Sequence, residues 1–132
     1  MTAFDPQQPH WLRDVRAAGD LFAPLAEEAL EVVALVYLDA DQRVLGMRHS
    51  RSQSSSALDL PIRAIAADAL AFDACGVVMA HNHPSGDHTP SQADRDATRL
   101  LARGLDALGV RLLDHLVVAR SGITSFRALG LL

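Results

Sequence analysis

The apolar residues of the chain fall into short runs that are predicted to be strands. Five such runs occupy residues 32–38, 43–47, 76–80, 110–119 and 123–126. The first run is nearly all apolar, which is typical of a central strand buried on both faces. The polar residues 39–42 form a turn between the first two runs, so these two strands are predicted to pair as an antiparallel hairpin.

Three other segments carry the signals of helices: 20–30, 61–73 and 94–108. Pro24 places the regular start of the first helix near Ala23, and Pro61 opens the second. Gly109 ends the third helix. Its predicted buried face consists of Ala93, Ala97, Leu100, Leu101, Leu105 and Leu108. Because helices connect several of the strands, the order of segments predicts an α/β fold with three layers, in which helices flank a mixed β-sheet.

The domain organisation follows from length and periodicity. A chain of 132 residues suits one domain. Residues 1–19 lack a hydrophobic period and are predicted to be an N-terminal arm, docked through Trp11 and Leu12, so the folded domain is expected to span residues 20–132. The serine-rich residues 50–59 are predicted to form a loop.

Charge and composition argue against several classes of protein. The formal net charge of −4 disfavours direct nucleic-acid binding through a broad basic face. No apolar run reaches the roughly 20 residues that span a bilayer, and the first residues lack a signal pattern. A cytoplasmic location without membrane contact is therefore expected. The single cysteine, Cys75, lies beside an apolar run and is predicted to be a small buried residue rather than a nucleophile.

The chemistry is concentrated after the strand at residues 76–80. His81 and His83 lie two positions apart at the end of this strand, so both imidazoles are expected on one side of it, with Asn82 on the other. A helix then begins, with Thr89 predicted as its N-cap and Pro90 as its first residue. Gln92 would complete the capping box and leave residues 91 and 94 available for other contacts.

Two imidazoles and the carboxylate of Asp94 form a set of three ligands for a divalent metal, with zinc as the expected ion. Three protein ligands leave a fourth position open for water, which is the mark of a catalytic site. Two structural alternatives exist: an isolated His-x-His can be a polar loop, and Ser91 with Asp94 matches a helix-capping pattern. A metal-activated water also needs a base. The chain has only three glutamates, Glu27, Glu28 and Glu31, and Glu31 lies at the junction of helix and strand.

Residues 81–94 and an upstream glutamate resemble the JAMM motif, also called JAB or MPN-plus, of zinc metallopeptidases. That motif reads His-x-His, seven residues, Ser, two residues, Asp. The matching residues are His81, His83, Ser91 and Asp94. More narrowly, the segment resembles the JAMM domain of the RadC family. Further agreement lies in Leu-Asp-His at 113–115 and Ser-Phe-Arg at 125–127, so the resemblance covers about residues 31–132.

The resemblance implies a cytidine-deaminase-like JAMM/MPN architecture and a role for each motif residue. Zinc would be held by His81, His83 and Asp94, and would lower the pKa of a bound water. Glu31, which aligns with the glutamate of the motif, would be the general base. Ser91 would donate a hydrogen bond to the developing oxyanion.

The function expected from the resemblance is that of a zinc-dependent hydrolase of peptide or isopeptide bonds, with a protein or peptide as substrate. The alternative is a metal-containing binding or regulatory module, associated with DNA repair and without turnover. Full-length RadC proteins carry a helix-hairpin-helix region before the JAMM domain, and this chain is expected to be too short for one, which weakens the link to DNA repair. RadC relatives place a substrate-side loop near residues 50–59, where a plain solvated loop is the alternative.

Two further histidines are not expected to be metal ligands. His88 stands where RadC relatives usually have proline. His115 is predicted to be a hydrogen-bonded core histidine, with contact to a metal ligand as the alternative. Zinc-deaminase chemistry is excluded, because Cys75 alone cannot supply a Cys-x-x-Cys pair.

Overall fold

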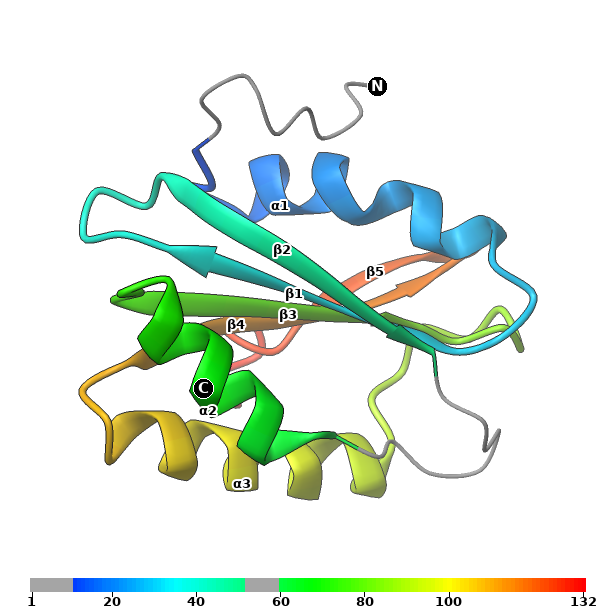
Figure 1. Cartoon of the computed structure of the whole chain (residues 1–132). Coiled ribbons are helices and arrows are strands. Elements are labelled where there is room, and N and C mark those ends of the chain that lie inside the picture. The colour runs from blue at the N-terminus through cyan, green and yellow to red at the C-terminus, as the bar shows by residue number, and fades with distance from the viewer. Residues whose placement is uncertain (1–10, 52–59) are drawn as a thin grey trace.

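The computed structural model describes residues 11–51 and 60–132 of the chain. Five strands form one sheet in the order β2-β1-β3-β4-β5, with helices on both of its faces (Figure 1). In chain order the elements are α1 (Val15–Phe22), the 3-10 helix η1 (Ala23–Glu27), β1 (Val32–Leu38), β2 (Val44–Arg51), α2 (Ile62–Ala71), β3 (Gly76–Asn82), α3 (Gln92–Asp106), β4 (Arg111–Ala119) and β5 (Gly122–Ser125). The predicted α/β fold with a mixed sheet between two helical layers is confirmed.

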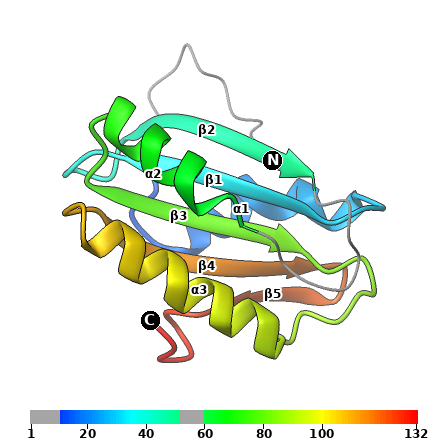
Figure 2. The same cartoon turned by 60° about the horizontal axis from the view of Figure 1, so that its bottom comes forward.

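The central strand β1 pairs antiparallel with both β2 and β3, whereas β3 and β4 form the parallel pair. The helix α3 makes the crossover between these two parallel strands (Figure 2). In the register of β1 and β3, Val33 lies opposite His81. The first residues of β1 therefore lie beside the last residues of β3, at the edge where the histidines of the motif are found.

Two apolar cores cover the two faces of the sheet. One core packs α1 and η1 against Val32, Ala34, Val36 and Leu38 of β1. The other packs α2 and α3 against Val33, Leu35 and Tyr37 of the same strand. Because successive side chains alternate between these cores, every residue of β1 is buried, which explains its continuous apolar run.

The first helix begins earlier than the sequence indicated. The helix α1 starts at Val15 because the side chain of Asp14 accepts a hydrogen bond from the backbone N–H of Ala17 at 2.7 Å and caps it. Pro24 lies in the tighter turn η1, so the prediction of one helix over 20–30 is wrong. The helix α1 thus crosses the boundary expected at residue 19.

The residues before this helix differ in their burial. Leu12 is buried in the core under α1, as docking of the arm predicted. Trp11 is 43% exposed, forms a backbone bridge with Arg43, and has the guanidinium carbon of Arg13 5.1 Å from the centroid of its ring. Residues 1–10 lie outside the described residues, so the rest of the predicted arm stays a prediction.

The structure also corrects two expectations about the end of β2 and the buried face of α3. The strand β2 continues to Arg51, so residues 50 and 51 do not belong to the loop expected over 50–59. Residues 52–59 lie outside the described residues, so the rest of that loop stays a prediction. On α3, Leu100 and Leu108 are exposed, because the buried stripe of this helix runs through Asp94, Thr98, Leu101 and Leu105. The first half of that stripe is polar because it faces the histidines of the neighbouring strands.

Cys75 is exposed, so its prediction as a buried residue is wrong. It lies in the turn before β3, where its backbone N–H donates to Leu38 and its carbonyl accepts from Arg111. The backbone of this turn is held by the sheet while the side chain points outward.

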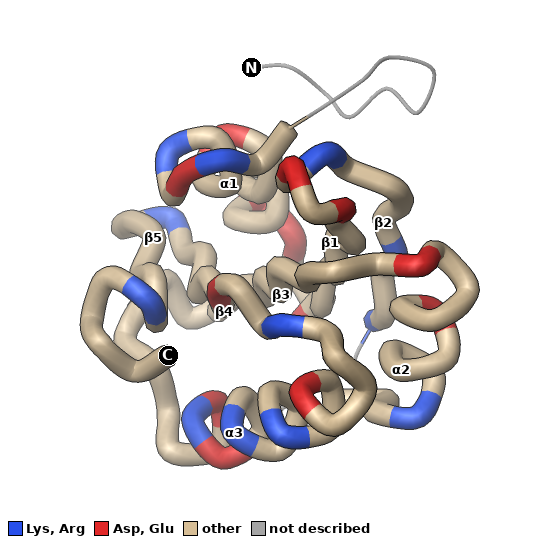
Figure 3. Tube along the Cα trace, turned by 90° about the vertical axis from the view of Figure 1, so that its left-hand side faces the viewer, with Lys and Arg blue, Asp and Glu red and all other residues tan. Residues whose placement is uncertain are grey.

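The outer surfaces of the helices are mixed in charge. Arginines and acidic residues are interspersed along α1 and α3 (Figure 3). Among the helices within 11–51 and 60–132, none combines the length and apolar character that crossing a bilayer requires.

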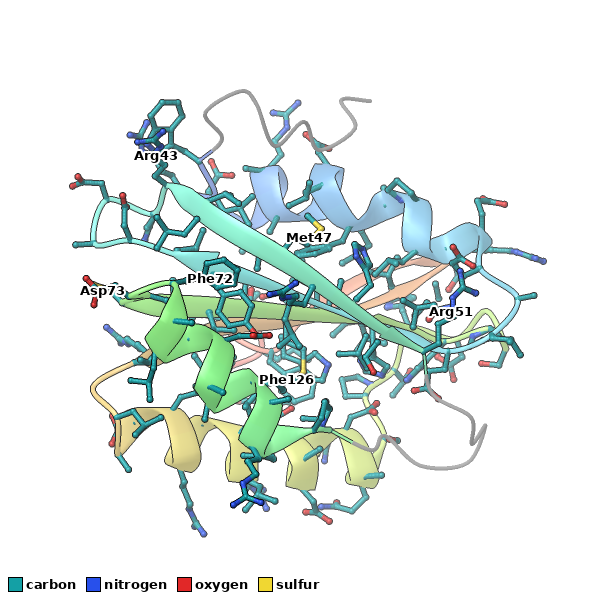
Figure 4. All side chains as sticks on the ribbon, viewed as in Figure 1. Arg43, Met47, Arg51, Phe72, Asp73 and Phe126 are labelled. Carbon is teal, nitrogen blue, oxygen red and sulfur yellow. The ribbon has the colours of Figure 1, made fainter. Side chains whose placement is uncertain are left out.

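Close approach of β2 to the end of α2 gives a test of this packing. A Cβ atom added at Gly46 would lie 2.5 Å from the ring of Phe72, which is labelled in Figure 4. Phe72 packs on Tyr37 with ring centroids 5.1 Å apart, so its displacement disturbs the core. We expect Gly46→Ala to lower the free energy of unfolding by about 1–2 kcal/mol, as overpacking does.

The matched control for this substitution is Gly104→Ala in α3. A Cβ there would meet Ile62 at an ordinary 3.5 Å, so the helix should gain about 0.5–1 kcal/mol from the better helix former. Urea denaturation of both variants measures the difference. Unchanged stability of Gly46→Ala would show that Phe72 moves at no cost.

Candidate metal centre

The two histidines of the motif lie at the end of β3 and face each other. His81 is fully buried, His83 is partly exposed, and their Nε2 atoms are 3.0 Å apart. The strand places both rings on the face of the sheet that α3 covers. The expected common orientation of the two imidazoles is therefore confirmed.

Asp94 connects the two rings. Its Oδ1 lies 3.1 Å from Nε2 of His81, and its Oδ2 lies 3.1 Å from Nε2 of His83. The carboxylate is buried and comes from the first turn of α3, the helix that packs over this end of the sheet. One residue of β3, the residue just after that strand and one residue of α3 thus converge on a single point.

The start of α3 differs from the prediction, because Ser91 and not Thr89 is the N-cap. The Ser91 hydroxyl oxygen accepts from the backbone N–H of Asp94 at 3.0 Å, and Oδ2 of Asp94 accepts from the backbone N–H of Ser91 at 2.8 Å. Thr89 instead donates to Asp87. The capping reading of Ser91 and Asp94 is thus correct, and it coexists with the cluster because a carboxylate has acceptor sites for several donors.

Glu31 completes the cluster from the segment just before β1. Its Oε1 lies 3.8 Å from Nε2 of His81, and its side chain is 11% exposed. The ligand atoms of Glu31, His81, His83 and Asp94 all lie within 4.8 Å of one another. Of the other glutamates, Glu28 approaches Arg51 at 3.8 Å instead. The structure thus brings together the predicted ligands and the predicted base, while the division of roles among them stays a prediction.

Asn82 explains how Glu31 is held, and the sequence did not reveal this role. The Asn82 side chain accepts from the backbone N–H of Val32 at 2.6 Å and donates to the carbonyls of Leu30 and Glu28 at 2.9 and 3.1 Å. These hydrogen bonds fix the position of the backbone on both sides of Glu31. The only signal in the sequence was the alternation that turns Asn82 away from the two histidines and buries an amide that needs partners.

His115 lies behind His81. Its Nε2 is 2.6 Å from Nδ1 of His81, and its ring is fully buried and stacked on Phe126. His115 is therefore a hydrogen-bonded core histidine that also touches a predicted ligand. His88 is not part of the cluster, since its Nδ1 lies 2.6 Å from the hydroxyl of Thr124.

The two other segments of family agreement have a structural role. Asp114 accepts hydrogen bonds from the backbone N–H groups of His115 and Arg127 at 2.7 and 3.0 Å, and from the Ser125 hydroxyl at 2.6 Å. These bonds hold the end of β5 and the following turn against β4. They place Phe126 where it can support the ring of His115.

Burial and hydrogen bonding shift the pKa values of the cluster. Burial alone would raise the pKa of Asp94, but contact with the His81 and His83 imidazoles and the hydrogen bond from the Ser91 N–H outweigh burial and hold this pKa well below its usual range. Burial raises the pKa of Glu31. Contact with the Asp94 carboxylate raises the pKa of His83 against the effect of burial. Burial lowers the pKa of His115 well below its usual range.

The donor set fits a metal ion. Nδ1 of His83 lies 2.8 Å from the carbonyl oxygen of Asp87, which only accepts hydrogen bonds, so Nδ1 carries a proton. In the neutral form of this ring, the Nε2 lone pair therefore faces the cluster. The carboxylates of Asp94 and Glu31 are also acceptors. Acceptor atoms gathered so closely repel one another unless a cation lies among them. Imidazole nitrogens with carboxylate oxygens are ligands that divalent metals such as zinc accept.

The mixed sheet, with two histidines at a strand end and an aspartate at the start of the next helix, is consistent with an α/β JAB/MPN-like fold. The chain matches the family model of the RadC-like JAB domain over residues 12–131, and it belongs to the RadC family. The predicted family is confirmed, and the match begins before residue 31, where the resemblance was expected to start.

Curated relatives agree with this assignment. A UPF0758 protein of Cupriavidus pinatubonensis is 44% identical over 108 residues, which are 82% of this chain and 46% of that protein. A UPF0758 protein of Symbiobacterium thermophilum is 38% identical over 89% of this chain and 50% of its own length. The UPF0758 protein YfjY of Escherichia coli is 38% identical over 77% of this chain and 64% of its own length. The chain thus spans about half the length of the first two relatives, and the three names state no activity.

The hydrogen bonds between Asn82 and the segment around Glu31 can be tested by measuring the free energy of unfolding. Asn82→Ala leaves one N–H and two carbonyls without their buried partner, so we expect the free energy of unfolding to fall by about 2–3 kcal/mol. Gln92→Ala is the matched control, because the Gln92 amide donates to Asp96 at an exposed position and its loss should cost less than about 0.5 kcal/mol. Chemical denaturation measures both variants, and equal losses would show that the Asn82 bonds contribute no more than a surface contact.

Proposed function

We propose that this domain is a zinc-dependent hydrolase that cleaves a peptide or isopeptide bond. The observation that carries the proposal is the convergence of two imidazole Nε2 atoms and one buried carboxylate, with a second, partly buried carboxylate 3.8 Å from one of those nitrogens. Membership of the RadC family supports it, since JAB domains include hydrolases.

The ligand set favours zinc among divalent metals. His81, His83 and Asp94 would hold the ion, because these three residues lie in mutual contact at 3.0–3.1 Å. When bound, the zinc ion would act as a Lewis acid that activates water and polarises the scissile carbonyl. Calcium and magnesium prefer sites made of oxygen ligands, so two imidazoles argue against them.

Glu31 would move the proton. It lies at the edge of the cluster, and its raised pKa brings the carboxylate closer to the range in which a base can both accept and return a proton. Glu31 would take a proton from the attacking water and deliver it to the leaving amine. Asn82 would keep the segment of Glu31 in position during both transfers.

Ser91 would serve the developing oxyanion. Its oxygen already accepts from the backbone N–H of Asp94, and within the described residues its hydroxyl proton is not donated to another group of the protein. A hydroxyl can accept and donate at once, so capping of the helix leaves the proton available. Such a donor contributes about 3 kcal/mol to transition-state stabilisation in comparable sites.

The proposed substrate is a protein or peptide that carries the amide to be cleaved. Direct binding of nucleic acid is not proposed, because the net charge is −4 and arginines are interspersed with acidic residues along the helices. The substrate itself would be identified by trapping with the Glu31→Gln variant, which should bind without turnover.

The metal is tested first. We expect about one zinc ion per chain, and we expect a chelator to lower the melting temperature, because a ligand bound only by the folded state stabilises it. The variant His81→Ala with His83→Ala should lose the metal, since both nitrogen ligands are gone. His49→Ala is the control and should keep it, because His49 lies exposed on the edge strand β2. Metal analysis and thermal melts measure these outcomes, and full zinc content in the double variant would overturn the assignment of ligands.

The roles of the two carboxylates are tested next. Asp94→Asn exchanges an anionic ligand for a weaker neutral one, so zinc content and hydrolysis should fall together. Glu31→Gln should keep near-normal zinc and lose at least about 10²-fold in rate, the scale of positioned acid–base catalysis. Zinc content is measured beside cleavage of fluorogenic peptides and isopeptides.

The control for both carboxylates is Glu27→Gln in η1, which should cleave like the unchanged protein. If Glu31→Gln cleaves at the normal rate, Glu31 is not the base. If the zinc-loaded protein cleaves no amide, the hydrolase proposal fails, and the metal centre belongs to a binding module.

A further inference from the structure

A buried chain of hydrogen bonds leads from α3 to the back of the His81 ring. The Thr98 hydroxyl lies 2.6 Å from the backbone carbonyl oxygen of Asp94 and 2.6 Å from Nδ1 of His115. Nε2 of His115 lies 2.6 Å from Nδ1 of His81. Thr98, His115 and His81 are 1% exposed or less, so water does not replace any of these partners.

The direction of each hydrogen bond in this series follows from the acceptor at its start, the backbone carbonyl of Asp94. The carbonyl oxygen of Asp94 can only accept, so the single hydroxyl proton of Thr98 is donated to it. The Thr98 oxygen must then accept from His115, which places a proton on Nδ1 of that ring.

The same reasoning continues from His115 to His81. The His115 ring is buried and contacts no carboxylate among the described residues, so it is neutral and its Nε2 has only a lone pair. That lone pair must accept from Nδ1 of His81. In the neutral form of His81, which is the form that binds a metal, the remaining nitrogen Nε2 then has only a lone pair, and it faces Asp94, His83 and Glu31.

The geometry holds the His115 ring firmly enough to act in this way. Its ring is stacked on Phe126, labelled in Figure 4, with centroids 4.4 Å apart and planes 23° from parallel. Its backbone is paired within the sheet opposite Met79 of β3, two residues before His81. Rotation of the ring would break the stacking and both hydrogen bonds together.

We propose that Thr98 and His115 are positioning residues that hold His81 in the tautomer whose Nε2 lone pair is presented to the metal. The inference rests on the proposed metal site and does not depend on the reaction being hydrolysis. It implies that metal affinity depends on a hydroxyl that contacts none of the ligand atoms. Hydrogen-bond partners behind metal-bound histidines act in this way in other metal sites.

Removal of the Thr98 hydroxyl should reverse the direction of the hydrogen bond between His115 and His81. Without an acceptor for Nδ1, His115 relieves a buried unpaired N–H by carrying its proton on Nε2. It then donates to Nδ1 of His81, and His81 must carry its own proton on Nε2, where it blocks the metal.

The experiment compares Thr98→Val with Thr98→Ser. Valine has nearly the shape of threonine but no hydroxyl, whereas serine keeps the hydroxyl. We expect Thr98→Val to weaken zinc binding by about 10–100-fold, the range for such outer partners, and Thr98→Ser to bind within about 3-fold of the unchanged protein. Competition with a chromogenic chelator measures the affinities, and thermal melts of the metal-free proteins measure the stability of each variant.

A second measurement reads the tautomers directly. Long-range ¹H–¹⁵N correlation spectra of the imidazoles, recorded on the metal-free and zinc-loaded proteins, should show His115 protonated on Nδ1 in the unchanged protein and in Thr98→Ser. Thr98→Val should show it protonated on Nε2. This readout does not move if Thr98 only fills space, and the spectrum of the unchanged protein suffices if Thr98→Val does not fold.

The inference is overturned by three results. His115 protonated on Nε2 in the unchanged protein contradicts the direction of the chain. A folded Thr98→Val variant with unchanged zinc affinity contradicts its effect, and equal weakening by valine and serine assigns Thr98 to packing. Failure of the unchanged protein to bind zinc would instead refute the proposed function, while the tautomer spectrum would still test the hydrogen-bond chain.

Discussion

The antiparallel pairing of β1 with β3 is the constraint on which the site depends. Its register places Val33 opposite His81, so Glu31, two residues before Val33, shares the face of the sheet to which His81 points. A shift of one residue would turn Glu31 toward α1 and η1 and would break the cluster. Burial on both faces of the two strands makes such a shift costly, because every apolar side chain would change core. The same apolar packing that stabilises the fold therefore sets the geometry of the metal centre.

The end of β3 serves both faces of the sheet at once. His81 and His83 form the cluster on the side of α3. Asn82, which lies between them in sequence, points to the opposite side and forms hydrogen bonds with the backbone around Glu31. The proposed base and the proposed ligands are thus connected through one short segment, although Glu31 and Asn82 are far apart in the chain.

The sequence predicted the elements that depend on local pattern and missed those that depend on tertiary contacts. The apolar runs gave the strand β1 with its observed bounds, and the spacing from His81 to Asp94 led to the correct cluster. The start of α1 was missed because its cap is Asp14, in a stretch without a long apolar period. The cap of α3 was misplaced by Pro90, which suggested Thr89, whereas the reciprocal bonds of Ser91 and Asp94 define the true start. The exposure of Cys75 and the grip of Asn82 depend on how distant segments meet, and no local pattern encodes that.

Asp94 shows why a capping residue is suited to the proposed role of metal ligand. Its Oδ2 accepts from the N–H of Ser91, which anchors the carboxylate to the first turn of α3 and restricts its rotation. The carboxylate therefore keeps its orientation toward both imidazoles before any metal arrives, and little side-chain entropy remains to be lost on binding. This rigidity has a cost, since acceptor atoms are held together in a buried place where they repel one another. A cation would relieve that repulsion. Because the fold already holds the acceptor atoms in place, the relief of repulsion would add to the affinity for the ion.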